Sequence, residues 1–111
     1  MTERQYQAKL IKKLARMFPG CMIWKMDPDY QQGMLDLIIL YRDKWASLEV
    51  KRSGDAVVQP NQVHFVQLLN DMSFAAFIYP ENEEEVLNAL QQAFEPSRRT
   101  RISEPQPVPL D

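Results

Sequence analysis

The chain of 111 residues is long enough for one domain with a core and too short for two. Its composition, 45% hydrophobic and 25% charged, excludes a collagen-like or wholly disordered protein. The net charge of -2 excludes the overall basic field of many nucleic-acid-binding proteins, so any phosphate binding has to use a local patch.

The cysteine content and the hydropathy bear on the cellular compartment. Cys21 is the only cysteine, which rules out an internal disulfide and suits a reducing environment. No apolar run approaches the ~20 residues of a membrane helix, and the first residues lack the apolar segment of a signal peptide. We therefore expect a cytoplasmic protein without a membrane partner.

The first half of the chain predicts a helix followed by three strands. Residues 2–18 carry apolar side chains at helical spacing, and Thr2 can cap this helix. A strand is expected over residues 21–26, and an apolar central strand over 37–41. A short polar turn then leads to an alternating strand over 45–51, which predicts an antiparallel hairpin.

The second half predicts a helix over 60–72, a strand over 74–79 and a helix over 82–94. The last residues, 96–111, are rich in proline and arginine and cannot pack a core. The fold class is therefore α/β, with the order αβββαβα and a mixed sheet flanked by helices. We expect a domain over residues 1–95 and a tail over 96–111.

Two carboxylates and a lysine stand at the ends of the hairpin strands. Asp36 precedes the first of them, and Glu49 and Lys51 share one face of the second. Hairpin register can bring the two carboxylates opposite each other, with Cβ atoms ~5 Å apart. Mg²⁺ prefers one or two carboxylates together with several waters, and the carbonyl of Val50 is a further candidate ligand. Lys51 could orient a water or offset negative charge in phosphodiester hydrolysis.

The series Gly33, Asp36, Glu49-Val50-Lys51 resembles the signature of the PD-(D/E)XK nuclease superfamily, within that family's restriction-endonuclease-like αβββαβ core. The likeness is greatest to small VRR-NUC and Holliday-junction-resolvase-like members, and it covers roughly residues 3–79. Leu35 departs from the pattern, because the family usually has proline before the aspartate.

The resemblance adds two candidate catalytic residues. Members of the family carry a glutamate in the first helix and a glutamine that opens the helix after the lysine strand; Glu3 and Gln62 stand in those places. On the helical wheel Glu3 falls amid the apolar stripe, where a buried carboxylate would need a partner such as a metal. The alternative, a solvated Glu3 at a frayed terminus, stays open, as does a simple capping role for Gln62.

A basic face of the first helix is a candidate surface for DNA. Lys9, Lys12, Lys13 and Arg16 fall together on the wheel, and Arg52 could extend this surface. Such a face is usually a solvated helix surface, whereas in a nuclease it becomes a phosphate track.

The resemblance implies a Mg²⁺-dependent endonuclease that cleaves DNA, with Mn²⁺ as a substitute and no small-molecule cofactor. By the same analogy we expect selectivity for branched or flapped DNA, a homodimer, and a phage or bacterial source, with the host cytoplasm as the compartment. The alternative is a non-catalytic subunit that keeps the nuclease fold for DNA binding or assembly.

Overall fold

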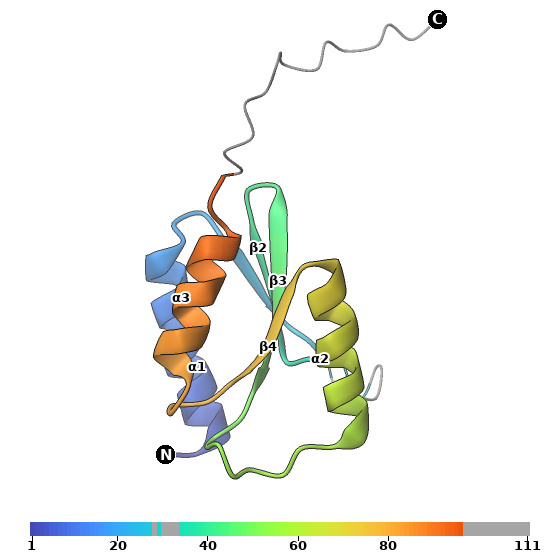
Figure 1. The fold of residues 1–111 in the computed structure, drawn as a ribbon. Coiled ribbons are helices and arrows are strands. Elements are labelled where there is room, and N and C mark those ends of the chain that lie inside the picture. Colours follow the sequence, from blue (N-terminus) through green and yellow to red (C-terminus); the bar gives the residue numbers. More distant parts are fainter. Residues whose placement is uncertain (28, 30–33, 97–111) are drawn as a thin grey trace, which may run out of the picture.

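A computed structural model describes residues 1–27, 29 and 34–96 of the chain (Figure 1). Within these residues, three helices and four strands follow one another in the predicted order αβββαβα, which confirms the fold class. Their bounds are α1 Glu3–Met17, β1 Met22–Lys25, β2 Leu37–Tyr41, β3 Lys44–Val50, α2 Pro60–Met72, β4 Phe74–Ile78 and α3 Glu83–Ala93. Gly33 and the tail after residue 96 lie outside the described residues.

The four strands form one mixed sheet in the order β1-β2-β3-β4. The β1–β2 and β2–β3 pairs are antiparallel, and β4 pairs parallel to β3 after the crossover through α2. A two-residue turn joins β2 to β3, and its first residue, Arg42, has a φ of 57°. Tight hairpin turns need such a positive φ, and the turn sets the register in which Leu37 faces Leu48.

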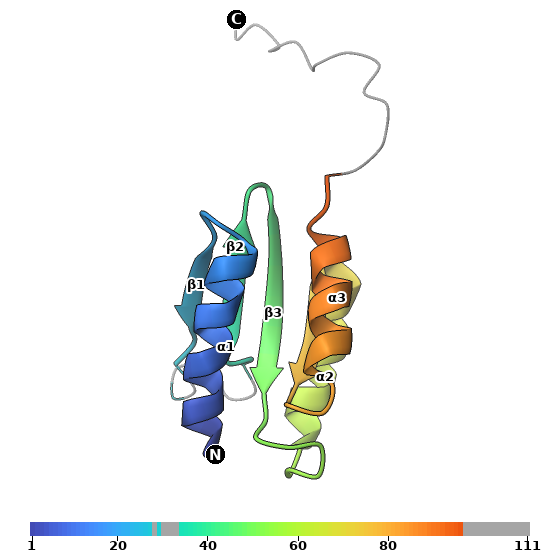
Figure 2. The ribbon, with the colours of Figure 1, turned by 90° about the vertical axis from the view of Figure 1, so that its left-hand side faces the viewer.

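Alternation along β3 divides its side chains between two layers. Leu48 and Val50 belong to the main core, together with the apolar sides of α1 and α3. Figures 1 and 2 show these two helices on one face of the sheet and α2 on the other. Glu49 and Lys51, which alternate with the core residues, therefore lie on the α2 face. Both are nevertheless buried, at 3% and 8% exposure, which is unusual for charged residues.

The outer edge of β4 is covered by two asparagine side chains. Asn70 Oδ1 accepts the N–H of Ala75 at 3.1 Å. Asn82 Oδ1 accepts the N–H of Tyr79 at 2.8 Å, and Asn82 Nδ2 donates to the carbonyl of Phe77 at 3.1 Å. An open strand edge is a template for unwanted pairing, and these side chains satisfy part of it.

The start of the first helix carries the expected capping signal. Thr2 Oγ1 accepts the N–H of Gln5, and Gln5 Oε1 accepts the N–H of Thr2, so the two residues form a capping box.

Across residues 1–27, 29 and 34–96, none of the helices has the length and hydropathy to traverse a bilayer.

Candidate active site

The β2–β3 hairpin brings Asp36 and Glu49 to the same place. The β2–β3 ladder ends at the Leu37–Leu48 pair, and Asp36 and Glu49 are the next residues along the two strands. Asp36 Oδ2 accepts the backbone N–H of Val50 at 2.8 Å. The Asp36 carboxylate is therefore tied to the strand that carries Glu49, although the two residues are thirteen positions apart in the sequence.

Gln62 connects the other two members of the site. Its Nε2 donates to Glu49 Oε2 at 2.7 Å, and its Oε1 accepts from Lys51 Nζ at 2.9 Å. The same Oε1 accepts the backbone N–H of Gln59 at 3.0 Å, so Gln62 also has the capping role that the sequence left open. The Lys51 ammonium lies 3.7 Å from Glu49 Oε2, so the three side chains form one connected group. Gln62 reaches them because α2 begins at Pro60 and its first turn lies over the end of β3.

The electrostatics of Glu49 are dominated by its burial. The pKa of Glu49 is raised to about 7: burial is the largest cause, the charge of Asp36 adds to it, and Lys51 acts in the opposite direction. Glu49 Oε1 is buried and has no hydrogen-bond partner among the described residues. Burial also raises the pKa of Asp36, against the opposing hydrogen bond from the Val50 N–H. The site thus holds two carboxylates whose negative charge is incompletely compensated.

Glu3, the first residue of α1, is exposed rather than buried in the apolar stripe, as the solvated alternative had it. Its position at the helix start keeps it outside the core, while Tyr6, Leu10 and Leu14 form the buried side of α1. The charge of Glu3 still acts on the site, because it contributes to the raised pKa values of Asp36 and Glu49. No hydrogen bond or ion pair joins it to them within the described part of the chain.

The site offers a small, oxygen-rich ligand set. Among the described residues, no three histidine, cysteine, aspartate or glutamate side chains are close enough to hold a metal ion by themselves. Mg²⁺ does not need three, because it keeps several waters and takes one or two carboxylates. The carbonyl of Val50 points to the same side of β3 as its N–H, which faces Asp36. The Asp36 carboxylate, the Glu49 carboxylate with its free Oε1, and the Val50 carbonyl therefore fit a hard cation.

The predicted basic residues are exposed, but they do not all face the same surroundings. Lys9, Lys13 and Arg16 line a groove between α1 and the start of α3. Lys13 Nζ contacts Glu83 Oε2 at 2.8 Å, so part of the positive charge is compensated there. Arg52 is exposed and directly follows Lys51, which makes it the basic residue nearest the site in the chain.

Phe77 and Tyr79 adjoin the site, but no pattern in the sequence identified them as candidate site residues. Phe77 pairs with Glu49 across the parallel β3–β4 ladder, so the two side chains share a face. The two aromatic residues line a pocket with Lys51. Only the sheet order could have identified them, because it places the apolar strand β4 beside β3.

Comparison with family models, with curated proteins and with solved structures finds no match for this chain. The assignment of a function therefore depends on the site itself. Its parts are two apposed carboxylates, a buried lysine and a glutamine that joins them.

Proposed function

We propose that this chain is a Mg²⁺-dependent endonuclease that hydrolyses phosphodiester bonds in DNA. The observation that carries the proposal is the state of Glu49, which is buried beside a second carboxylate and has one oxygen without a partner among the described residues. A fold gains nothing from such an arrangement, because burying incompletely paired charges destabilises it. A bound divalent cation would compensate both carboxylates and supply a partner for the free oxygen.

Each residue of the site has a role in this proposal. Asp36, Glu49 and the carbonyl of Val50 would hold the cation. When bound, Mg²⁺ neutralises phosphate charge and makes a water more acidic, which is the chemistry that phosphodiester hydrolysis requires. The carboxylates belong to neighbouring strands of one sheet, so their separation is set by rigid elements rather than by a loop.

Lys51 would act on the substrate. Its ammonium group is held by Gln62 and lies beside Glu49, where it can donate a hydrogen bond to a phosphate oxygen or to the attacking water. A positive charge in a buried position stabilises negative charge developing on the phosphate better than one in bulk water. Gln62 is then a positioning residue, because it contacts Lys51 and Glu49 and keeps both in place.

The substrate and the assembly follow from the sequence resemblance alone. The resemblance implies branched or flapped DNA as the preferred substrate and a homodimer as the active form. Arg52, which directly follows Lys51, and the exposed basic residues of α1 would contact phosphates of the bound DNA. Mn²⁺ would substitute for Mg²⁺, since both take oxygen ligands.

A nicking assay tests the proposal. Supercoiled plasmid and branched DNA are incubated with Mg²⁺, with Mn²⁺ or with EDTA, using the native chain, Asp36→Asn and Lys51→Met. Asp43→Asn is the matched control, because Asp43 is an exposed carboxylate in the turn at the far end of the same hairpin. We expect metal-dependent nicking by the native chain and the control only.

A thermal shift measurement provides a readout independent of catalysis. A ligand present at 100 times its Kd stabilises a protein by about 2.7 kcal/mol. Saturating Mn²⁺ should therefore raise the Tm of the native chain and leave the Tm of the Asp36→Asn variant unchanged. DNA binding without cleavage under every metal would favour the alternative, a non-catalytic subunit.

A further inference from the structure

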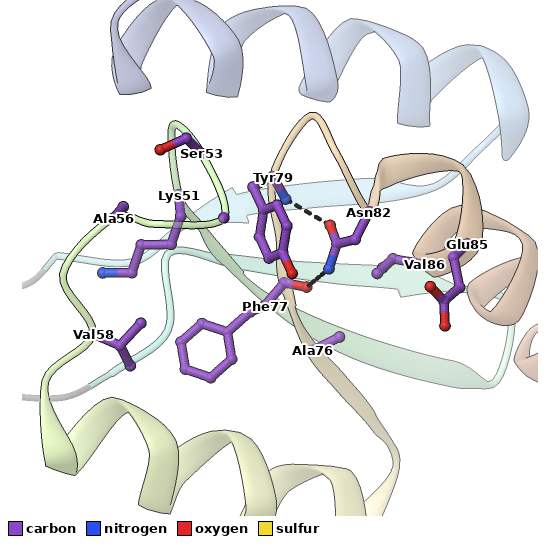
Figure 3. A pocket seen from close by; sticks show the side chains of 11 residues that line it. Lys51, Ser53, Ala56, Val58, Ala76, Phe77, Tyr79, Asn82, Glu85 and Val86 are labelled. Carbon is purple, nitrogen blue, oxygen red and sulfur yellow. Dashed lines mark hydrogen bonds between the residues drawn. The ribbon is translucent and has the colours of Figure 1, made fainter.

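A pocket of about 510 Å³ opens beside the candidate active site. Figure 3 shows Lys51 and Val58 at one end, the rings of Phe77 and Tyr79 in the middle, and Glu85 at the opposite end. Its volume falls in the ~300–1,000 Å³ range that is typical of pockets for small ligands. There is room for a nucleobase and its sugar.

The position of the pocket relates it to the reacting phosphate. Lys51 belongs both to the wall of the pocket and to the group formed with Gln62 and Glu49. Phe77 is the ladder partner of Glu49 on the neighbouring strand. A nucleotide whose phosphate lies at Lys51 would therefore lie beside the pocket.

The loop that closes one side of the pocket is held against the aromatic wall. A Cβ at Gly54 would lie 3.1 Å from Cε2 of Tyr79, so only glycine allows this close approach without a shift of the ring. The N–H of Gly54 also donates to Glu81 Oε1 at 3.2 Å. These contacts position the Tyr79 ring and the loop together, so the pocket exists before any ligand binds.

The lining has the character of a base-binding site. Aromatic rings and small apolar side chains supply flat surface on which any base can stack. The carboxylate of Glu85 at the far end disfavours a phosphate, and it can accept a hydrogen bond from the exocyclic amino group of cytosine or adenine. Lys51 at the near end suits the phosphate side of a nucleotide.

We propose that this pocket binds the base of an unstacked nucleotide adjacent to the cleaved phosphodiester. The inference rests on the proposed nuclease function and deepens it, because it supplies a reason for selectivity. A base inside a duplex is stacked and paired, and removing it costs a few kcal/mol. At a flap or a branch point that cost is already reduced, so the pocket favours such DNA.

The test measures binding rather than cleavage. Flapped oligonucleotides labelled with fluorescein are titrated with the protein in EDTA, and fluorescence anisotropy gives the Kd. An abasic site is moved one nucleotide at a time along the flap and across the branch point. Loss of one stacked base should weaken binding by about 5- to 100-fold at a single position and little elsewhere.

Two neighbouring residues provide a matched pair of variants. Val58 lines the pocket, whereas Val57 does not line it and is 76% exposed. Val58→Trp should fill the pocket and abolish the abasic effect, while Val57→Trp should retain it. Tyr79→Leu is a second probe and should reduce the abasic effect without filling the space. Circular dichroism confirms that each variant is folded.

The outcomes separate the two proposals. An abasic effect confined to one position, lost in Val58→Trp and kept in Val57→Trp, supports the pocket whether or not the protein cleaves DNA. Equal Kd values for every abasic position, or an effect that survives in Val58→Trp, would overturn it. Metal-dependent nicking alongside that negative result would leave the nuclease assignment intact.

Discussion

The replacement Glu49→Gln should stabilise the protein in the absence of metal. The Glu49 carboxyl is 3% exposed, and burial with the charge of Asp36 raises its pKa to about 7, against 4.5 for an ordinary glutamate. A raised native pKa means that the folded state holds a proton that the unfolded state releases between these two pH values. The stabilisation that the protonated Glu49 gives the folded state is complete below pH 4.5 and is lost as the pH rises to about 7.

The magnitude follows from the size of the shift. Each pKa unit corresponds to ~1.4 kcal/mol, so the ionised Glu49 costs the folded state about 3 kcal/mol above pH 7. Glutamine has the same shape, carries no charge and can still accept the hydrogen bond from Gln62 Nε2. The gain from Glu49→Gln should therefore grow from under about 1 kcal/mol at pH 5 to about 3 kcal/mol at pH 8.

Urea unfolding in EDTA at pH 5, 6, 7 and 8 measures this gain. The control is Glu95→Gln, because Glu95 is exposed and lies outside the site. A Glu49→Gln variant that is no more stable than the native chain at pH 8, or whose stability difference does not change with pH, would refute the reasoning. Mg²⁺ at 100 times its Kd should remove most of this difference at pH 8, since only the native chain would gain the ~2.7 kcal/mol of a bound cation.

Three further predictions concern the network, the basic face and the assembly. Gln62→Leu removes the partners of Glu49 Oε2 and Lys51 Nζ and should cost about 1–3 kcal/mol in urea unfolding; a neutral result would mean that Gln62 holds neither. Lys12→Glu with Arg16→Glu should weaken DNA binding and reduce its salt dependence by about one unit of slope per lost phosphate contact. If anisotropy titrations in several salt concentrations show no change, these side chains are merely solvated. Light scattering at micromolar concentration should give a mass near twice 13.0 kDa, and a monomer would exclude the dimer.

Local patterns were sufficient to predict the elements and the meeting of the carboxylates. Helical spacing identified α1, and Pro60 marked the start of α2. The polar turn predicted the hairpin. Counting residues from this turn along the two strands then predicted that Asp36 approaches Glu49. These features depend on residues close in the sequence, which is why they can be predicted from one sequence.

Contacts between distant segments could not be predicted in this way. Lys13 pairs with Glu83, seventy positions away, and only the packing of α1 beside α3 brings them together. The pocket beside Lys51 is built partly from alanine, valine and glycine, residue types that indicate no chemistry by themselves. The helical wheel predicted that Glu3 lies on the apolar side of α1. The start of the helix extends beyond the core, however, so the Glu3 side chain is exposed.

The central claim is that Asp36, Glu49 and Lys51 act together in hydrolysis of a phosphodiester. Single-turnover cleavage of an end-labelled branched DNA, with enzyme in excess and Mg²⁺ present, tests it most directly. We predict cleavage by the native chain, none in EDTA, and a rate ~10²- to 10³-fold lower in Asp36→Asn and in Lys51→Met, as expected when a group that stabilises transition-state charge is removed. Folded protein that leaves the DNA intact, or variants that cleave as fast as the native chain, would contradict the claim.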